Sequence, residues 1–144
     1  MAPSAWNRPF RTDTASLLAG LRAILPAEAL LEGPDATAPY AADWAGGAHQ
    51  PPVAVAIPDC IEQVQRIVQQ CAAYDAPIVP RGAGTGPTGG SRPHHQGVVV
   101  SLAHLDQIVE LDPERRLARV QPGVAPITIN EAAAPFGLQY PPDP

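Results

Sequence analysis

The sequence predicts an α+β domain, and three observations lead to this prediction. Its 144 residues are the length of a single domain. Apolar residues recur at helical spacing in some segments and at strand spacing in others. From residue 52 onward these segments follow one another as strand, helix, strand, strand, hairpin and helix. We therefore expect an N-terminal lead-in over residues 1–51 and a folded domain over residues 52–144.

The first predicted element is an amphipathic helix over Thr14 to Leu25. Its apolar residues recur every three or four positions, and Pro26 ends the pattern; they are Leu17, Leu18, Leu21, Ile24 and Leu25. A polar stretch interrupted by prolines follows to Pro52, and no regular element is predicted there.

A strand, a helix and a second strand are predicted next. Residues 53–58, VAVAIP, alternate as a strand does. Asp59 and Glu62 have the spacing of a capping box, which predicts that a helix opens there. The apolar face of that helix consists of Ile61, Val64, Ile67, Val68 and Cys71. The helix closes at residues 75–77, and the short strand of residues 78–79 follows.

The remaining predicted elements are a strand, a hairpin and a helix. Residues 97–102, GVVVSL, form an apolar strand. Residues 107–112 and 117–122 are predicted to pair as a hairpin, with its turn at residues 112–116. A short helix is expected over residues 126–134, because Pro135 and Gly137 end the helical pattern.

The two cysteines are predicted to be unpaired. Cys60 and Cys71 would lie about 16 Å apart along the axis of one helix, which is too far for a disulfide. We expect both to be small buried apolar side chains rather than metal ligands or redox groups.

The charge balance argues against a nucleic-acid partner. Lys and Arg total 9 against 14 Asp and Glu, a net charge of -5, and the arginines are scattered, whereas phosphate backbones are bound by a basic face. No apolar signal-peptide core is seen in residues 1–14, and no run of about 18 apolar residues could span a membrane. We expect a cytoplasmic protein that meets the inner membrane only through partners.

A glycine-rich segment directly follows the second strand. It reads PRGAGTGPTGGSRP over residues 80–93, and glycine allows main-chain N–H groups to approach an anion closely. The P-loop pattern fits residues 84–91 except that Gly90 stands in the place of the essential lysine. The Rossmann pattern fits Gly84, Gly86 and Gly89, but turn sequence follows where a helix is required.

Two interpretations of the glycine segment remain open on the residue pattern alone. In one, a nest of amides between two strands holds the diphosphate of a dinucleotide. In the other, the segment is a long surface loop without a ligand.

Four segments, in order, carry a resemblance to a known family: PRGAGTGPTGG (80–90), GVVVSLAHLDQIVELDP (97–113), ARVQPGV (118–124) and GLQYPPDP (137–144). They resemble the FAD-binding domain of the FAD-linked oxidases of the p-cresol methylhydroxylase or vanillyl-alcohol oxidase type, most of all the D-lactate dehydrogenases and the flavoprotein of glycolate oxidase. The resemblance implies an α+β fold of two subdomains that hold FAD between them, of which this chain contains the N-terminal part, truncated at its C-terminus.

The resemblance also implies a set of cofactor-binding residues. The diphosphate of FAD would lie on Pro80, Arg81, Gly82, Ala83, Gly84, Thr85, Gly86, Thr88, Gly89 and Gly90, through main-chain amides and the two threonine hydroxyls. The ribityl and flavin side would be lined by Gly123, Val124, Pro142, Asp143 and Pro144. Arg81 is either a phosphate partner or an ordinary surface ion-pair residue, and both interpretations stay open. FAD is expected to bind non-covalently, because Ser91 stands where some members carry a flavin-linked histidine after Gly-Gly.

The activity implied by the resemblance is oxidation of a small 2-hydroxy acid, such as glycolate or D-lactate, by an FAD-dependent oxidoreductase. The family's C-terminal substrate-binding region has no counterpart here, and no catalytic or metal-binding residue is identified. We therefore expect the 144-residue chain alone to be inactive, the hydroxy acid to bind only with that region, and companion subunits to be partners. The alternative is a truncated, inactive remnant or a binding module that depends on a partner.

Overall fold

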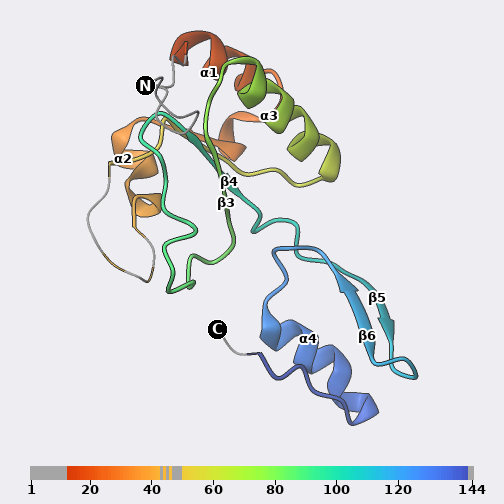
Figure 1. The fold of residues 1–144 in the computed structure, drawn as a ribbon. Helices are drawn as coiled ribbons and strands as arrows, with labels where there is room; N and C mark the ends of the chain where they lie inside the picture. Colours follow the sequence, from red (N-terminus) through yellow and green to blue (C-terminus); the bar gives the residue numbers. More distant parts are fainter. Residues whose placement is uncertain (1–12, 43, 45, 47–49, 143–144) are drawn as a thin grey trace, which may run out of the picture.

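A computed structural model describes residues 13–42, 44, 46 and 50–142 of the chain. Its main sheet has four strands in the order β1-β2-β4-β3 (Figure 1). Their bounds are Leu30–Glu32 for β1, Ala54–Ala56 for β2, Ile78–Arg81 for β3 and Val98–Ser101 for β4. Strands β2, β4 and β3 run parallel, and β1 is antiparallel to β2. The mixture of helices with this sheet confirms the predicted α+β class.

Two helices cover one face of this sheet. Helix α1 (Thr14–Arg22) packs beside α3 (Ile61–Ala73). Their buried side chains form one core with alternate residues of the central strands, because successive strand residues point to opposite faces. That core includes Leu17, Leu21, Leu25, Ile67 and Cys71 from the helix side and Ala54, Ala56, Val98 and Val100 from the sheet. Val55 and Val99 on the opposite face are also fully buried, which explains the continuous apolar runs in β2 and β4.

The segment between α1 and β2 contains regular structure that the sequence did not predict. Strand β1 pairs with β2, with Leu31 opposite Val55, and α2 (Pro34–Thr37) and two single turns of 3-10 helix, Ala27–Ala29 and Ala38–Tyr40, flank it. Three residues are too few for an alternating pattern to stand out, so pairing with β2 decides this strand. The lead-in therefore contributes an edge strand and α1 to the main core, while the boundary near residue 52 remains a prediction.

Helix ends differ from the prediction in two places. Helix α1 ends at Arg22 rather than Leu25. After it the Ile24 N–H donates to the Leu21 carbonyl, three residues back, at 3.0 Å, so the chain forms a tighter turn before Pro26. The predicted Asp59–Glu62 capping box is wrong: the residue that caps α3 is Cys60, and its side chain makes no capping bond. Instead, the Asp59 N–H donates to Gln63 Oε1 at 2.9 Å.

The C-terminal elements lie apart from the main sheet (Figure 1). Strands β5 (Ile108–Asp112) and β6 (Leu117–Val120) form the predicted antiparallel hairpin, with an irregularity between Ile108 and Glu110. Helix α4 (Pro126–Ala133) follows and continues into a 3-10 turn, Ala134–Phe136. Among the residues described, none of the helices has the length and apolar character to cross a membrane.

Candidate functional site

The glycine segment leaves the carboxyl end of β3 and returns to the start of β4. Strands β3 and β4 are parallel neighbours, with Arg81 opposite Ser101, so the connection must travel the length of the sheet. Such crossovers usually contain a helix, but residues 82–97 form only turns and bends. The loop therefore lies at the edge of a parallel sheet where ligands commonly bind, and no helix N-terminus backs it.

Several main-chain N–H groups of this loop are available as hydrogen-bond donors. The amides of Gly82 to Gly86 have no hydrogen-bond acceptor among the residues that the structure describes. These residues are exposed except Gly84, which is half-buried. Main-chain N–H groups seldom stay unpaired unless water or a ligand meets them. A run of free amides at a strand end is what a diphosphate requires.

The glycines of the loop are of two kinds. Around Gly82, Gly86 and Gly90 no atom lies within 4 Å of the position that a Cβ would take, so that side of the backbone is bare. Gly84 and Gly89 have φ values of 76° and 79°, which favour glycine. Their missing side chains leave room for the guanidinium groups of Arg81 and Arg92 respectively. The loop thus has an open side and a side filled by arginine.

Arg81 does not extend from the loop toward solvent. Its Nη1 donates to the carbonyl of Ala42 at 2.9 Å and, at a longer 3.5 Å, to that of Ser91, and its guanidinium lies 5.6 Å from the Tyr40 ring centre. No carboxylate among the described residues forms an ion pair with it. The side chain is bound to main-chain carbonyls, an arrangement that neither sequence-based interpretation of Arg81 predicts.

The other predicted loop residues are accessible. Pro80, Ala83, Thr85 and Thr88 are exposed, so the two threonine hydroxyls are available to a ligand. Ser91, which the sequence analysis considered only as the residue after Gly89-Gly90, has a buried Oγ without a hydrogen-bond partner among the described residues. Because that hydroxyl is enclosed, an incoming anion would meet the amides and threonines before it.

The predicted flavin-side residues are not gathered at the loop in the same way. Gly123 packs against the 102–105 turn: its N–H donates to the Leu105 carbonyl at 2.8 Å, and a Cβ would overlap the Leu102 carbonyl oxygen. This contact gives Gly123 a structural reason to be glycine. The Val124 N–H donates to the Gln121 carbonyl at 3.1 Å, and Pro142 is exposed. Asp143 and Pro144 lie outside the described residues. The role of these five residues toward a cofactor remains a prediction.

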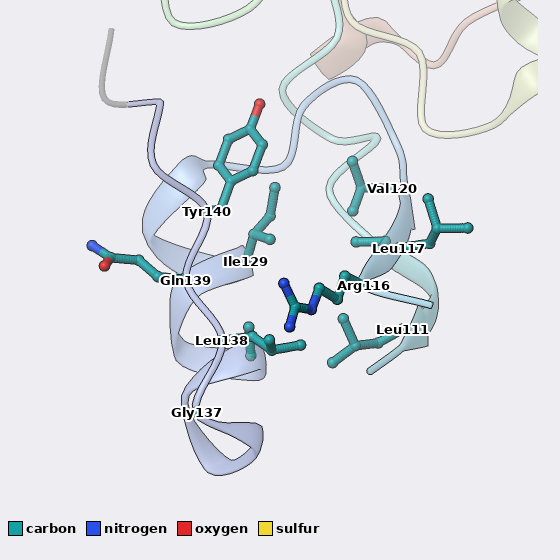
Figure 2. Close-up of a pocket in the computed structure, with 11 residues that line it drawn as sticks. Leu111, Arg116, Leu117, Val120, Ile129, Gly137, Leu138, Gln139 and Tyr140 are labelled. Carbon is teal, nitrogen blue, oxygen red and sulfur yellow. The ribbon is translucent and has the colours of Figure 1, made fainter. Parts of the chain in front are cut away.

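A cavity of about 580 Å³ lies elsewhere, between the β5–β6 hairpin and α4 (Figure 2). Apolar side chains from both elements line it, including Leu111, Val120, Ile129 and Leu138. The Arg116 side chain extends from the hairpin into the space toward α4, and Tyr140 also lines the cavity. None of the predicted cofactor residues is among the described residues that line it. We therefore assign it to the packing of the C-terminal elements and not to the glycine-loop site.

The histidines and cysteines form no metal centre in the described part of the chain, where no three His, Cys, Asp or Glu side chains converge. The rings of His94 and His95 stack with centroids 4.6 Å apart. Burial, and secondarily the neighbouring His95, lower the pKa of His94, so a cationic ring is disfavoured there. The cysteines Cys60 and Cys71 are free thiols, and burial raises the pKa of Cys71 to about 11.

Comparison with known proteins links this geometry to one family. Residues 52–144 match the family described as FAD binding domain. The chain is similar to glycolate oxidase subunit GlcD of Escherichia coli, with 39% identity over 132 residues, which cover 92% of this chain and 26% of that protein. It is also similar to D-2-hydroxyglutarate dehydrogenase of Stutzerimonas stutzeri, with 34% identity over 132 residues, or 92% of this chain and 28% of that protein.

The solved structures agree with this relationship. A crystal structure of p-cresol methylhydroxylase with substrate bound superposes with a TM-score of 0.71 and 27% identity, over 86% of this chain and 25% of that one. The predicted family fold is therefore confirmed for its N-terminal part. The chain spans about a quarter of the length of the curated relatives it matches.

Proposed function

Because this chain belongs to the FAD-binding domain family, we propose that its glycine loop holds the diphosphate of FAD as part of an oxidoreductase that acts on a small 2-hydroxy acid, of the glycolate or D-lactate type. The observation that carries the proposal is the run of amides from Gly82 to Gly86, at the end of β3, that have no acceptor within the described part of the chain. The bare faces of Gly82, Gly86 and Gly90 let a phosphate come close to the main chain.

The residues of this chain bind and orient the cofactor. The loop amides and the hydroxyls of Thr85 and Thr88 donate to phosphate oxygens, and hydrogen bonds to a charged group are stronger than those to a neutral one. FAD, once bound, supplies the two-electron acceptor for oxidation of the hydroxy acid. No residue of this chain is assigned here to substrate binding or to accepting a proton from the substrate.

Three further features of the function are part of the proposal. FAD binds without a covalent link, since Ser91 follows Gly89-Gly90. Companion subunits are proposed because the Escherichia coli relative is named as a subunit of glycolate oxidase. The substrate class rests on relatives named for glycolate, D-lactate and D-2-hydroxyglutarate.

The diphosphate assignment is tested by titrating the purified chain with FAD, ADP and riboflavin, using calorimetry and flavin fluorescence. We expect FAD and ADP to bind and to displace each other, whereas riboflavin, which lacks the diphosphate, does not compete. If neither FAD nor ADP binds, the alternative of an inactive remnant or partner-dependent module replaces this proposal. Competition by riboflavin equal to that by ADP would place binding on the flavin and contradict the role of the loop.

Whether this chain serves as the FAD-holding part of a 2-hydroxy-acid oxidoreductase is tested in a chimera in which it replaces the 132 aligned residues of Escherichia coli GlcD. We expect glycolate-dependent reduction of an artificial acceptor dye by the purified chimera. The control is the same chimera with Gly84→Val, in which a branched side chain would need a positive φ and would overlap Arg81. A folded chimera that binds no FAD, or that binds FAD without reducing the dye, would contradict this role, because the rest of the chimera is that of GlcD.

A further inference from the structure

We propose that Arg81 and Arg92 are positioning residues that hold the glycine loop against a segment outside the matched domain. This inference rests on the proposed function, in which the loop binds the diphosphate of FAD. The segment outside the matched domain consists of the described residues of 40–46 (Tyr40, Ala41, Ala42, Trp44 and Gly46) and is called the support segment below. The match to the FAD-binding family begins at residue 52, so this part of the site precedes the matched domain in sequence.

The first contact is made by Arg81, at the end of β3. Its Nη1 donates to the Ala42 carbonyl at 2.9 Å, and its guanidinium lies over the Tyr40 ring, 5.6 Å from the centre. The same guanidinium occupies the space that a side chain on Gly84 would fill. One planar group therefore touches the support segment and the inner side of the loop together, which an ammonium on a flexible stem cannot reproduce.

The second contact repeats this arrangement at the other end of the loop. Arg92 Nη2 donates to the Gly46 carbonyl at 3.0 Å. Its Nε lies 3.0 Å from the position that a Cβ of Gly89 would take. Each arginine thus joins one positive-φ glycine of the loop to one carbonyl of the support segment. The loop is held at two points, one on each side of Gly86.

A main-chain bond completes the attachment. The Trp44 N–H donates to the Gly84 carbonyl at 3.0 Å, so the carbonyl of this glycine points to the support segment. Gly84 has this carbonyl orientation together with a left-handed backbone conformation, with φ of 76°. The amides of residues 82–86 have no acceptors among the described residues. The support segment therefore fixes which side of the loop faces a ligand.

This arrangement distinguishes positioning from direct phosphate binding. Nη1 of Arg81 is engaged with main-chain carbonyls, the rest of its guanidinium lies against Gly84, and the side chain is only half exposed. An arginine that pairs with a phosphate would make binding depend on its charge, and salt would screen that contribution. An arginine that positions the loop acts through its fork of hydrogen bonds, and its charge is incidental.

The experiment compares Arg81→Lys, Arg81→Gln and Arg92→Lys with the unaltered chain, using ADP as the probe at several salt concentrations. The control is Arg115→Gln, which removes a positive charge from the exposed hairpin pair with Asp112. Hydrogen exchange of the Trp44 amide, which donates to the Gly84 carbonyl at 3.0 Å, is the second readout in the ligand-free chain, and circular dichroism verifies that each variant is folded.

We expect all three loop-arginine variants to weaken ADP binding by about tenfold, the loss of roughly one hydrogen bond to a charged group. Lysine and glutamine at position 81 should weaken ADP binding equally, the salt dependence should stay unchanged, and exchange of the Trp44 amide, which is bonded to the Gly84 carbonyl, should become faster. A near-normal Arg81→Lys with a weakened salt dependence in Arg81→Gln would overturn the positioning role in favour of phosphate contact.

Failure of this inference is distinguishable from failure of the proposed function. Normal ADP affinity and unchanged exchange in the variants would refute the positioning role while leaving the diphosphate site intact. If the unaltered chain binds no ADP, the proposed function fails, and the exchange readout still decides whether the arginines hold the loop. A variant that loses its fold is replaced by Tyr40→Leu, which removes only the ring beneath Arg81 and should speed exchange of the Trp44 amide bonded to the Gly84 carbonyl.

Discussion

At the scale of single residues, the glycines of the loop have different causes. Gly82, Gly86 and Gly90 leave a bare main chain on the open side, whereas Gly84 and Gly89 combine a positive φ with close approach of an arginine. A sequence motif treats all five alike. The distinction matters for substitution, because a side chain at Gly84 disturbs the loop itself, and one at Gly86 obstructs only what would bind to it.

The two thiols should differ in reactivity. Cys71 is fully buried and burial raises its pKa to about 11, whereas Cys60 is half-buried at the start of α3. The thiolate is the reactive form, and almost none exists at Cys71 near pH 8. We expect Ellman's reagent to label one thiol in the native chain and two after addition of denaturant. Rapid native labelling that persists in Cys60→Ser would contradict the burial of Cys71.

At the scale of elements, α3 ends in a Schellman motif with an unusual residue. The Ala76 N–H donates to the Cys71 carbonyl at 2.9 Å and the Asp75 N–H to that of Ala72 at 3.3 Å. Asp75 has a φ of 55°, in the left-handed region where glycine is preferred. The helix is therefore stopped by a residue that carries backbone strain.

Replacing Asp75 with glycine should stabilise the chain. Relief of left-handed strain, about 1–2 kcal/mol for a residue with a Cβ, exceeds the entropic cost of glycine, about 0.5–1 kcal/mol. We expect the free energy of unfolding in urea to rise by roughly 0.5–1 kcal/mol. Asp75→Ala keeps the Cβ and serves as the control, with no gain expected. Equal effects of the two substitutions would show that strain at this position is not the cause.

At the scale of the whole molecule, the C-terminal elements are poorly covered. Within the described part of the chain, strands β5 and β6 pair only with each other, and an isolated two-stranded hairpin is marginally stable in water. Exposed large apolar side chains gather in this region, at Val109, Leu117, Ile127, Phe136 and Tyr140. Unpaired strand edges with apolar side chains favour association with another chain.

This exposure predicts concentration-dependent self-association through the hairpin. Leu117, which is 61% exposed, contributes to it, and Leu117→Glu should shift the chain toward monomer in sedimentation velocity. Ile61→Glu is a matched control, because Ile61 is 69% exposed but lies on α3, away from the hairpin. Equal effects of both variants would indicate non-specific aggregation, and a monomer at all concentrations in the unaltered chain would contradict the prediction.

The sequence by itself determined the elements whose patterns are local. Helical spacing predicted α1 and α3, and the Pro135 and Gly137 stop signals helped to predict α4. Alternation predicted β2, a continuous apolar run predicted β4, and the DPERR turn predicted the hairpin. It also located the glycine loop after a strand and excluded the P-loop and Rossmann forms, since lysine and a following helix are both missing. The sequence also indicated the family, because the four segments 80–90, 97–113, 118–124 and 137–144 resemble it in the same order along the chain.

Only the tertiary structure decided what depends on distant partners. Strand β1 is too short to show a pattern and exists through pairing with β2. The hydrogen-bond partner of Arg81 could not be predicted from the sequence, because its acceptor, the Ala42 carbonyl, lies 39 residues away. The same holds for Gly123, whose neighbour is the main chain at Leu102. Every residue has a main-chain carbonyl that can accept a hydrogen bond. A contact to such a carbonyl therefore does not depend on the residue type and cannot be predicted from the sequence.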